Sequence, residues 1–219
     1  MRYDAVLFDM DGTVLDTLED MRDSVNASLR HFSLPELTLV QVRTYVGNGA
    51  RRLIEQAVPE GSGSALTERV LAYYKRYYDA HCRIKTKAYE GILPLMTELR
   101  EHGLRLGIIS NKPDTAVREL AEDFFPGLLE IAVGENESAG VRRKPWPDSV
   151  NTAVRLLGLS KSCCVYVGDS EVDIATAKNA GLDCISVCWG FRSREELKRA
   201  CASVIVGNTE ELKAELLKE

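Results

Sequence analysis

The expected fold is decided by Ala5–Thr13, which reads AVLFDMDGT: a short apolar run that ends in acidic and turn-forming residues. An apolar run of this length, closed by a turn signal, is typical of a buried strand in a parallel sheet. Side chains two residues apart on a strand point the same way, so we expect Asp9 and Asp11 side by side at the carboxyl edge of the sheet, where open α/β sheets bind ligands. Two carboxylates so close repel each other, and a shared proton or a hard cation has to offset their charge.

This pair of carboxylates indicates phosphoryl chemistry, because one can attack phosphorus while the other carries a proton. The alternative is an Asp-Gly turn after a core strand, in which both carboxylates cap the following helix. The rest of the chain has to distinguish these two interpretations.

The composition is that of a globular protein. The chain has 219 residues, of which 45% are hydrophobic and 28% charged, and its net charge is −5. This length suits one large domain or a core with one insertion. The acidic balance argues against nucleic acid or an anionic membrane as a partner, and no apolar stretch approaches the length of a transmembrane helix. The chain enters a strand almost at once, which indicates that there is no signal peptide.

None of the six cysteines has the CxxC or Cys/His spacing of a zinc site. Their positions, mostly in apolar runs, indicate small buried thiols in a reducing compartment. We therefore predict a cytoplasmic protein. It is expected to be a monomer or a homodimer, and the phosphoryl chemistry indicated by Asp9 and Asp11 implies a small phosphorylated metabolite as its partner.

Short apolar β-type runs alternate with helical patterns along most of the chain. The expected strands are 3–9, 104–111, 131–134, 163–169, 183–189 and 203–206. The expected helices are 92–102, 113–124, 147–157, 172–180, 194–199 and 210–217. This alternation predicts an α/β fold, a Rossmann-like doubly wound parallel sheet with helices on both faces.

One stretch, 16–87, breaks the alternation because it has no convincing strand. Helical periodicity is found instead at 18–32, 39–46, 50–58 and 66–82. A loop of this length without structure of its own would be implausible. We therefore expect a small helical domain, 16–87, inserted after the first strand of a core domain made of 1–15 and 88–219.

Two further segments bring polar groups to the same edge of the sheet. Ser110 follows an apolar run and precedes a helix, so its hydroxyl and the free helix amides can bind an anion; the alternative is an ordinary cap before a Pro-started helix. Lys144 precedes Pro145, which restricts Lys144 to extended conformations. A fixed ammonium suits a phosphate oxygen or the paired carboxylates, whereas the alternative is a solvated basic loop.

The segment 163–173 adds two more carboxylates. Asp169 closes a buried strand, Ser170 can cap the next helix, and Asp173 lies one helical turn further on. Four converging carboxylates need compensation, and an oxygen-rich octahedral pocket is what Mg²⁺ prefers. The alternative is that Asp169 and Asp173 only favour a helix N-terminus electrostatically.

Taken in chain order, DMDGT, Ser-Asn-Lys, Lys-Pro and GDSEVD resemble the four signature motifs of the haloacid dehalogenase superfamily. The helical insert directly after the first motif resembles the C1-type cap of that family. Within the insert, Val46–Leu53, which reads VGNGARRL, is similar to the phosphoglycolate phosphatase subgroup. Asn-Gly is also a generic turn signal that opens a helix.

The resemblance implies a catalytic role for each matching residue. Asp9 is the implied nucleophile, which forms an aspartyl-phosphate. Asp11 protonates the leaving alcohol and then deprotonates the hydrolytic water. Ser110 and Lys144 bind the phosphoryl oxygens. An Asp at the position of Asp11 distinguishes a phosphatase from a dehalogenase, because a halide leaving group needs no proton.

The resemblance also implies the ligands of the metal and of the substrate. Mg²⁺ is expected on Asp9, the backbone carbonyl of Asp11 and Asp169, with Asp173 supporting through water or Lys144. Substrate contacts are expected from Gly12, Thr13 and Asn111 in the core and from Gly47, Asn48, Gly49 and Arg51 in the insert. Arg51 can reach a substrate carboxylate, and the alternative is a solvated arginine.

We predict a Mg²⁺-dependent phosphatase of small phosphomonoesters, with phosphoglycolate as the expected substrate. One alternative is another activity on the same scaffold: a pyrophosphatase, a nucleotide or sugar phosphatase, or a phosphomutase. The second is a non-catalytic module that binds a small ligand or a protein, against which the intact Asp9, Asp11, Lys144 and Asp169 argue. The bulky Trp146 either packs its own loop or shapes the entrance to the site.

Overall fold

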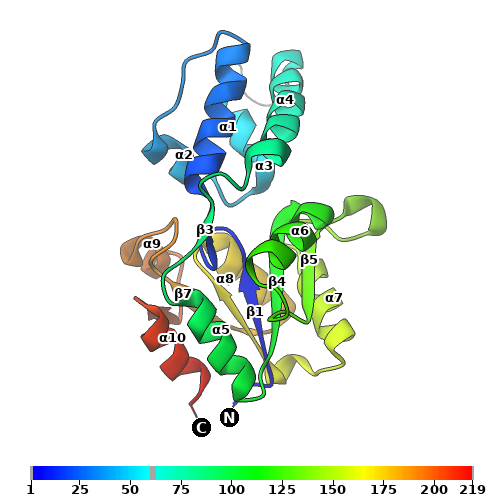
Figure 1. The fold of residues 1–219 in the computed structure, drawn as a ribbon, viewed down its shortest axis with the longest axis vertical. Coiled ribbons are helices and arrows are strands. Elements are labelled where there is room, and N and C mark those ends of the chain that lie inside the picture. The colour runs from blue at the N-terminus through cyan, green and yellow to red at the C-terminus, as the bar shows by residue number, and fades with distance from the viewer. Residues whose placement is uncertain (1, 60–62, 219) are drawn as a thin grey trace. The chain divides into compact units, whose positions relative to one another are not determined.

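The computed structural model describes residues 2–59 and 63–218. The chain divides into two compact units, Met1–Leu15 with Ala88–Glu219, and Asp16–Lys87 (Figure 1). The first is called the core unit and the second the helical unit.

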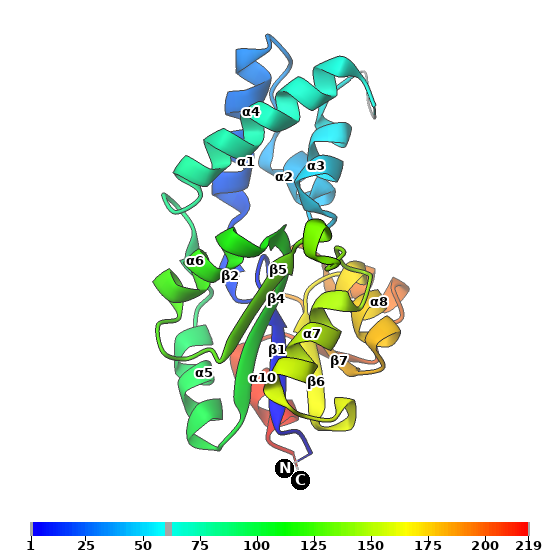
Figure 2. The ribbon, with the colours of Figure 1, turned by 90° about the vertical axis from the view of Figure 1, so that its right-hand side faces the viewer.

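Within the described residues, the core unit contains a six-stranded sheet in the order β5-β4-β1-β6-β7-β8 (Figure 2). All neighbouring strands run parallel. The strands are β1 (Ala5–Asp9), β4 (Arg105–Pro113), β5 (Ile131–Glu135), β6 (Cys164–Gly168), β7 (Asp183–Val187) and β8 (Val204–Val206). The prediction of a parallel α/β sheet is confirmed, because each expected apolar run forms a strand.

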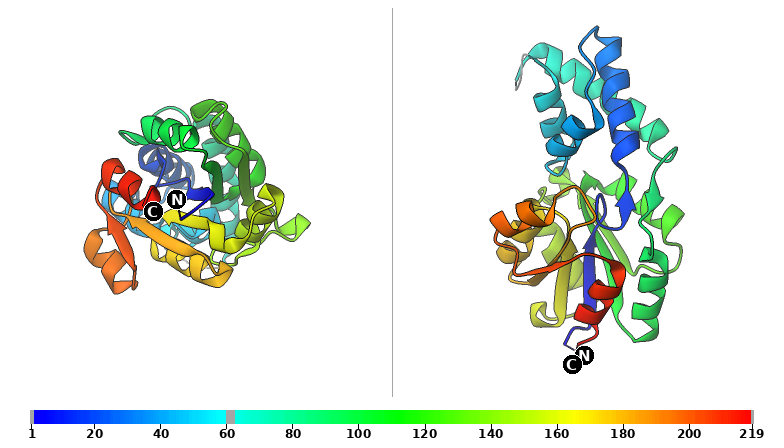
Figure 3. Two further views of the ribbon diagram at one scale, coloured as in Figure 1. Left: turned by 90° about the horizontal axis from the view of Figure 1, so that it is seen from below. Right: turned by 90° about the vertical axis from the view of Figure 1, so that its left-hand side faces the viewer.

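Helices cover both faces of this sheet (Figure 3). They are α5 (Ile92–Glu101), α6 (Asp114–Phe124), α7 (Asp148–Leu157), α8 (Glu171–Ala180), α9 (Arg194–Arg199) and α10 (Thr209–Leu216). On one face, α7 and α8 pack on the central strands through a buried apolar cluster that includes Leu7, Val150 and Ala177. On the other face, α5 packs against β4 and α10 (Figure 1). All five residues of β1 are buried, as expected for a strand covered on both sides.

Strand β1 lies in the middle of the sheet, where the chain changes direction. From β1 the chain continues to β4 and β5 on one side, and then returns to β6, β7 and β8 on the other side. Open α/β sheets bind ligands outside the carboxyl ends of their strands at such a switch point. The residues at the carboxyl ends of β1, β4 and β6 therefore belong to one edge.

The helical unit contains, within its described residues, α1 (Leu18–His31), α2 (Leu39–Tyr45), α3 (Gly49–Ala57) and α4 (Ala65–His81). Helix α1 packs against α2 and α4, and α3 also packs against both. Two short strands, β2 (Leu15–Asp16) and β3 (Lys87–Ala88), pair where the chain passes between the units. The sequence did not predict these strands, because two residues show no periodicity.

None of the described helices combines the length and the apolar character that crossing a membrane requires. All six cysteines are free thiols, but only Cys82 and Cys164 are buried, and Cys201 is exposed. The expectation of buried thiols is therefore wrong for most of them. Cys163 lies in a 3₁₀ turn before β6, and Cys188 follows the end of β7, so both lie outside the buried strands.

A buried carboxylate stabilises the helical unit. Asp20 on α1 accepts hydrogen bonds from the backbone N–H of Lys85 at 3.0 Å, from that of Thr86 at 2.8 Å, and from Thr86 Oγ1 at 2.8 Å. We expect Asp20→Ala to lower the free energy of unfolding by about 2–3 kcal/mol, because buried N–H groups lose their acceptor. Urea unfolding measures the loss. Asp23→Ala is the matched control: Asp23 pairs with Lys85 Nζ in a surface ion pair, and its loss costs at most about 1 kcal/mol. Equal losses in the two variants would contradict this role of Asp20.

Candidate active site

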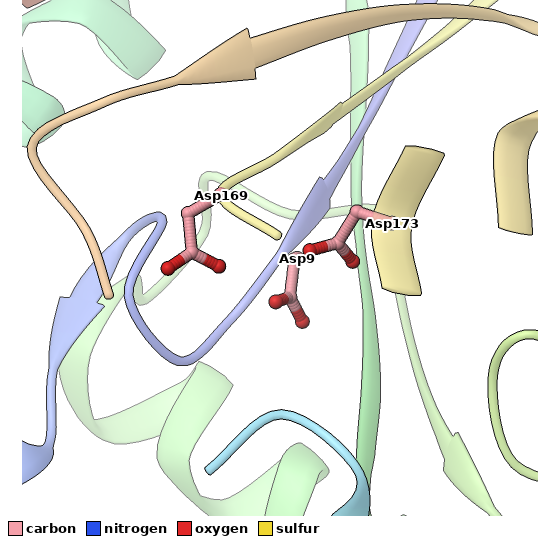
Figure 4. Close-up of side chains that lie close together, drawn as sticks. All are labelled: Asp9, Asp169 and Asp173. Atoms are coloured by element: carbon pink, nitrogen blue, oxygen red, sulfur yellow. The ribbon is translucent and has the colours of Figure 1, made fainter. Parts of the chain in front are cut away.

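Three carboxylates of the core unit meet at the carboxyl edge of the sheet. Asp9 ends β1, Asp169 follows β6, and Asp173 lies in the first turn of α8. One oxygen of each lies within 4.8 Å of the others, and Figure 4 shows the three side chains close together. All three residues are buried. The structure thus brings together three of the four carboxylates that the sequence placed at this edge.

Lys144 is the cation of this cluster. Its Nζ lies 2.7 Å from Asp9 Oδ1 and 2.7 Å from Asp173 Oδ1. Burial lowers the pKa of Lys144, but attraction by Asp173 and Asp9 outweighs burial, so the pKa lies well above its ordinary value and the ammonium stays charged. Asn111 fixes the backbone of this residue: Asn111 Oδ1 accepts from Lys144 N at 2.6 Å, and Asn111 Nδ2 donates to Lys144 O at 3.3 Å.

Both oxygens of Asp173 accept hydrogen bonds from the protein itself. Oδ1 accepts from Lys144 Nζ at 2.7 Å and from the Tyr166 hydroxyl at 3.2 Å. Oδ2 accepts from Ser170 N at 3.1 Å and from Ser170 Oγ at 2.6 Å. Asp173 therefore caps α8, as one interpretation from the sequence held, and also binds Lys144. Its oxygens are less available to a metal than those of Asp9 and Asp169.

Asp169 is fixed by the loop after β7, which none of the sequence motifs includes. Phe191 N, in the loop after β7, donates to Asp169 Oδ2 at 2.5 Å. A Cβ at Gly12 would lie 2.3 Å from the same oxygen, and a Cβ at Gly190 would lie 2.1 Å from the Gly12 carbonyl. Glycine at both positions therefore allows two loops to approach Asp169. The signal was present in the sequence, because the expected strand 183–189 had to end at this edge.

Asp11 has a cation of its own. Strand β1 ends at Asp9, so Asp11 lies in the following turn instead of on the strand. Asp11 Oδ1 lies 2.8 Å from the Nζ of Lys112, whose side chain is 8% exposed. Lys112 is a residue of the site to which no sequence pattern assigned a role. The expected strand ended at residue 111, whereas β4 continues with an irregular register to Pro113, and this extension contains Lys112.

The charge of the site calls for a further cation. The four carboxylates and the two ammonium groups described above leave two negative charges unmatched. Burial, followed by repulsion from Asp173, raises the pKa of Asp9 to about 7 and the pKa of Asp169 well above its ordinary value. The second oxygens of Asp9 and Asp169 accept no hydrogen bond from the described part of the chain. This set of oxygen donors fits a hard divalent cation.

Ser110 is buried at the irregular end of β4. Its Oγ accepts a hydrogen bond from Lys112 N at 3.2 Å. Its own O–H donates to no group among the described residues. The hydroxyl can therefore donate to an anion, as the sequence suggested.

Gly12 and Thr13 form the turn after β1, and their N–H groups are used inside it. Gly12 N donates to Leu15 O at 2.9 Å, and Thr13 N donates to Met10 O at 3.4 Å. A residue outside the turn also binds it: Trp189 Nε1 donates to Thr13 O at 3.0 Å. Thr13 Oγ1 is buried and has no hydrogen-bond partner among the described residues.

The remaining expected site residues lie in the helical unit. Gly47 and Gly49 have φ values of 114° and 81°, which favour glycine. Asn48 is the N-cap residue of α3, but its side chain makes no capping hydrogen bond. The guanidinium of Arg51 binds both oxygens of Glu68, at 2.5 and 3.1 Å. The structure thus gives Arg51 a protein partner that neither interpretation from the sequence included.

Trp146 packs against its own loop. The Arg142 guanidinium lies 3.9 Å from the Trp146 ring centroid, and Arg142 Nε and Nη2 bind the two oxygens of Asp148 at 2.6 and 2.9 Å. The tryptophan is still 54% exposed. Loop packing, one of the two alternatives, is therefore what the structure shows for this residue.

A buried aspartate at the end of the central strand, beside a lysine and two further carboxylates at a topological switch point, defines a class of hydrolase. The sequence profile of the haloacid dehalogenase-like hydrolases matches residues 6–187. The chain belongs to this family.

Relatives of known name narrow the class to phosphatases. The phosphoglycolate phosphatase of Xanthomonas campestris pv. campestris (strain 8004) is 35% identical over 193 residues, which cover 86% of this chain and 84% of the relative. Phosphoglycolate phosphatase 1 of Pseudomonas aeruginosa PAO1 is 28% identical and covers 94% of this chain and 77% of its own length. A solved structure of a candidate phosphoglycolate phosphatase from Lactobacillus delbrueckii subsp. bulgaricus is 38% identical, with a TM-score of 0.94 and full coverage of both chains. The chain is a hydrolase of the phosphatase type.

Proposed function

We propose that this enzyme hydrolyses small phosphomonoesters through an aspartyl-phosphate on Asp9, with Mg²⁺ as cofactor and phosphoglycolate as substrate. The environment of Asp9 carries the proposal. One of its oxygens is bound by Lys144 at 2.7 Å, and the other accepts no hydrogen bond from the described residues at the edge where such sheets bind ligands. The phosphoglycolate phosphatases among the relatives support this choice of substrate.

The reaction takes two displacements at phosphorus. In the first, Asp11 enters in its protonated form: Asp9 attacks phosphorus, the bond from phosphorus to the alcohol oxygen breaks, and Asp11 gives its proton to that oxygen. In the second, water attacks the phosphorus of the acyl phosphate while Asp11 takes a proton from the water. The bond from phosphorus to Asp9 breaks, inorganic phosphate leaves, and the Asp9 carboxylate is restored.

The other residues bind and orient. Lys144 and the Ser110 hydroxyl bind the phosphoryl oxygens, whose charge has to be neutralised during transfer. Asn111 acts on Lys144, because its amide bonds to both backbone polar groups of that residue. We therefore assign Asn111 a positioning role in place of the substrate contact that the sequence suggested.

Mg²⁺ would be held by Asp9, Asp169 and the backbone carbonyl of Asp11. When bound, it neutralises the charge of the carboxylates and of the phosphoryl group. Asp173 contributes to the site by binding the Lys144 ammonium.

The two acidic residues near the metal are expected to respond differently to mutation. Asp169→Asn should raise the Mg²⁺ concentration for half-maximal activity by at least about 10- to 100-fold, the loss typical of changes around a metal ligand, because it weakens a direct ligand. Asp173→Asn, the matched variant, should lower kcat and shift the Mg²⁺ requirement less, because Asp173 binds Lys144 and Ser170. Activity measured against Mg²⁺ concentration tests both. A larger shift in Asp173→Asn would contradict the assignment of ligands.

The helical unit is proposed to be a mobile cap that selects the substrate. The chain leaves the core unit at Leu15, directly after the turn that contains Asp11, and returns at Ala88. An insert with this topology can cover the site during phosphoryl transfer and exclude water. Within it, Gly47, Asn48, Gly49 and Arg51 are the proposed contacts, and Arg51 would have to exchange Glu68 for a ligand.

A panel of phosphate compounds tests the proposed function. We expect the highest kcat/KM for phosphoglycolate, compared with pyrophosphate, a nucleoside monophosphate, a sugar phosphate and an aryl phosphate, all with Mg²⁺. A higher kcat/KM for pyrophosphate or for a nucleotide would mean that this compound, and not phosphoglycolate, is the preferred substrate. Slow net hydrolysis with transfer to a sugar phosphate would indicate a mutase. No turnover of any ester would indicate a binding module and refute the proposal.

A further inference from the structure

We propose that Lys112 selects a carboxylate on the leaving alcohol, so that the enzyme prefers phosphate esters of 2-hydroxy acids. This inference rests on the proposed phosphatase function and adds the residue that recognises the alcohol part of the substrate. Lys112 Nζ lies 2.8 Å from Asp11 Oδ1, and the two side chains are only 8% and 16% exposed. The Lys112 ammonium therefore lies beside Asp11, the proposed proton donor to the leaving oxygen.

The distances suit a carboxylate next to the ester oxygen. A general acid has to come within hydrogen-bond reach, about 3 Å, of the oxygen that it protonates. Lys112 Nζ lies 2.8 Å from Asp11 Oδ1, so it is within two hydrogen-bond lengths of the ester oxygen when Oδ1 is the oxygen that gives the proton. In an ester of a 2-hydroxy acid the carboxylate is attached to the carbon that bears the ester oxygen. Its oxygens therefore lie between the ester oxygen and Lys112 Nζ, within reach of the ammonium. A neutral alcohol of the same size places no charge there.

The two buried lysines then serve opposite sides of the bond that breaks. Lys144 lies 2.7 Å from both Asp9 and Asp173, on the phosphoryl side, whereas Lys112 lies on the alcohol side. An ammonium that folding has already removed from water binds a carboxylate through a strong charge-assisted hydrogen bond.

Lys112 is also held in place before any substrate binds. Its N–H donates to Ser110 Oγ at 3.2 Å, and the next residue, Pro113, is paired with Glu135 of β5. Such preorganisation lowers the entropy cost of recognition.

The test compares kcat/KM for three esters. Phosphoglycolate has the carboxylate beside the ester carbon, 3-phosphooxypropionate has it one carbon further away, and 2-hydroxyethyl phosphate has no charge on the alcohol. The proteins are the wild type, Lys112→Met, Lys112→Gln, Lys112→Arg, Arg51→Ala and the control Lys178→Met, a change at an exposed position on α8. Circular dichroism and Tm show which variants are folded.

We expect the wild type to prefer phosphoglycolate over both other esters. Lys112→Met and Lys112→Gln should lower the preference for phosphoglycolate over 2-hydroxyethyl phosphate by about 10- to 100-fold. Lys112→Arg, which keeps the charge, should retain most of the preference, and Lys178→Met should not change it.

Three results would overturn the inference while leaving the phosphatase function in place. Equal losses on the charged and the neutral ester would mean that Lys112 only orients Asp11. An unchanged preference in both Lys112→Met and Lys112→Gln would mean that Lys112 does not contact the substrate. Loss of the preference in Arg51→Ala but not in Lys112→Met would place the carboxylate site in the helical unit. A wild type that does not prefer carboxylate esters would contradict both this inference and the proposed substrate.

Discussion

Replacing Asp9 with Asn is expected to lower turnover by about 10⁴-fold or more, since the loss of a covalent nucleophile removes the chemical step itself. The amide has nearly the same shape as the carboxylate, so the fold should persist. Assays with phosphoglycolate and with an aryl phosphate measure the loss. Asp23→Asn, on the surface of the helical unit, is the control for a neutralised acid and should keep full activity. A variant at position 9 that retains a tenth of wild-type turnover would rule out the covalent mechanism.

The same substitution should stabilise the protein in the absence of metal. The pKa of Asp9 is raised from 3.8 to about 7, so between these pH values the folded protein binds a proton that the unfolded chain does not. Stability therefore falls as pH rises through this window, and Asp9→Asn removes this contribution. At about 1.4 kcal/mol per pKa unit, the variant should gain about 1–4 kcal/mol above pH 7. Thermal unfolding in a chelator at pH 5 and pH 8 measures the gain, and a lower Tm for the variant at pH 8 would contradict the burial argument.

Replacing Asp11 with Asn is expected to slow esters of basic alcohols by about 10²–10⁴-fold. The reason is that the alkoxide of phosphoglycolate needs a proton as it leaves, whereas an activated aryl oxide does not. The formation of the phosphoenzyme from an aryl phosphate should therefore be nearly unchanged, while its hydrolysis slows because Asp11 also activates the water.

Burst kinetics with an aryl phosphate separate these two steps. We expect Asp11→Asn to release the phenol of the aryl phosphate in a rapid burst of one mole per mole of enzyme, followed by slow turnover. Equal slowing of the burst for activated and unactivated esters would remove Asp11 from the role of general acid.

The sequence predicted the sheet well because its signals were local. The predicted runs 163–169 and 183–189 nearly coincide with β6 and β7. Parallel strands that are covered on both faces produce such continuous apolar runs in the sequence. Asp9 and Asp169 could be placed at one edge from topology alone, because both follow buried strands. The helical periodicities within 16–87 likewise correspond to α1–α4.

The contacts that depend on three-dimensional geometry were not predictable from periodicity. Lys112 reaches Asp11 because β4 continues past an irregular register, which no local pattern indicates. The Phe191 N–H reaches Asp169 because glycines allow two loops to approach. Arg51 binds Glu68, which lies on a different helix of the same unit.

In the proposed mechanism phosphorus becomes covalently bound to Asp9, and chemical trapping detects this bond. Wild type, Asp11→Asn and the control Asp9→Asn are mixed with an aryl phosphate and Mg²⁺, quenched in acid and reduced with borohydride, which converts an aspartyl-phosphate to homoserine. Peptide mass spectrometry then locates the reduced residue. We expect homoserine at position 9 in the wild type and in Asp11→Asn, with more in Asp11→Asn, and none in Asp9→Asn. Homoserine at another aspartate, or none in a protein that is turning over substrate, would contradict the proposed mechanism.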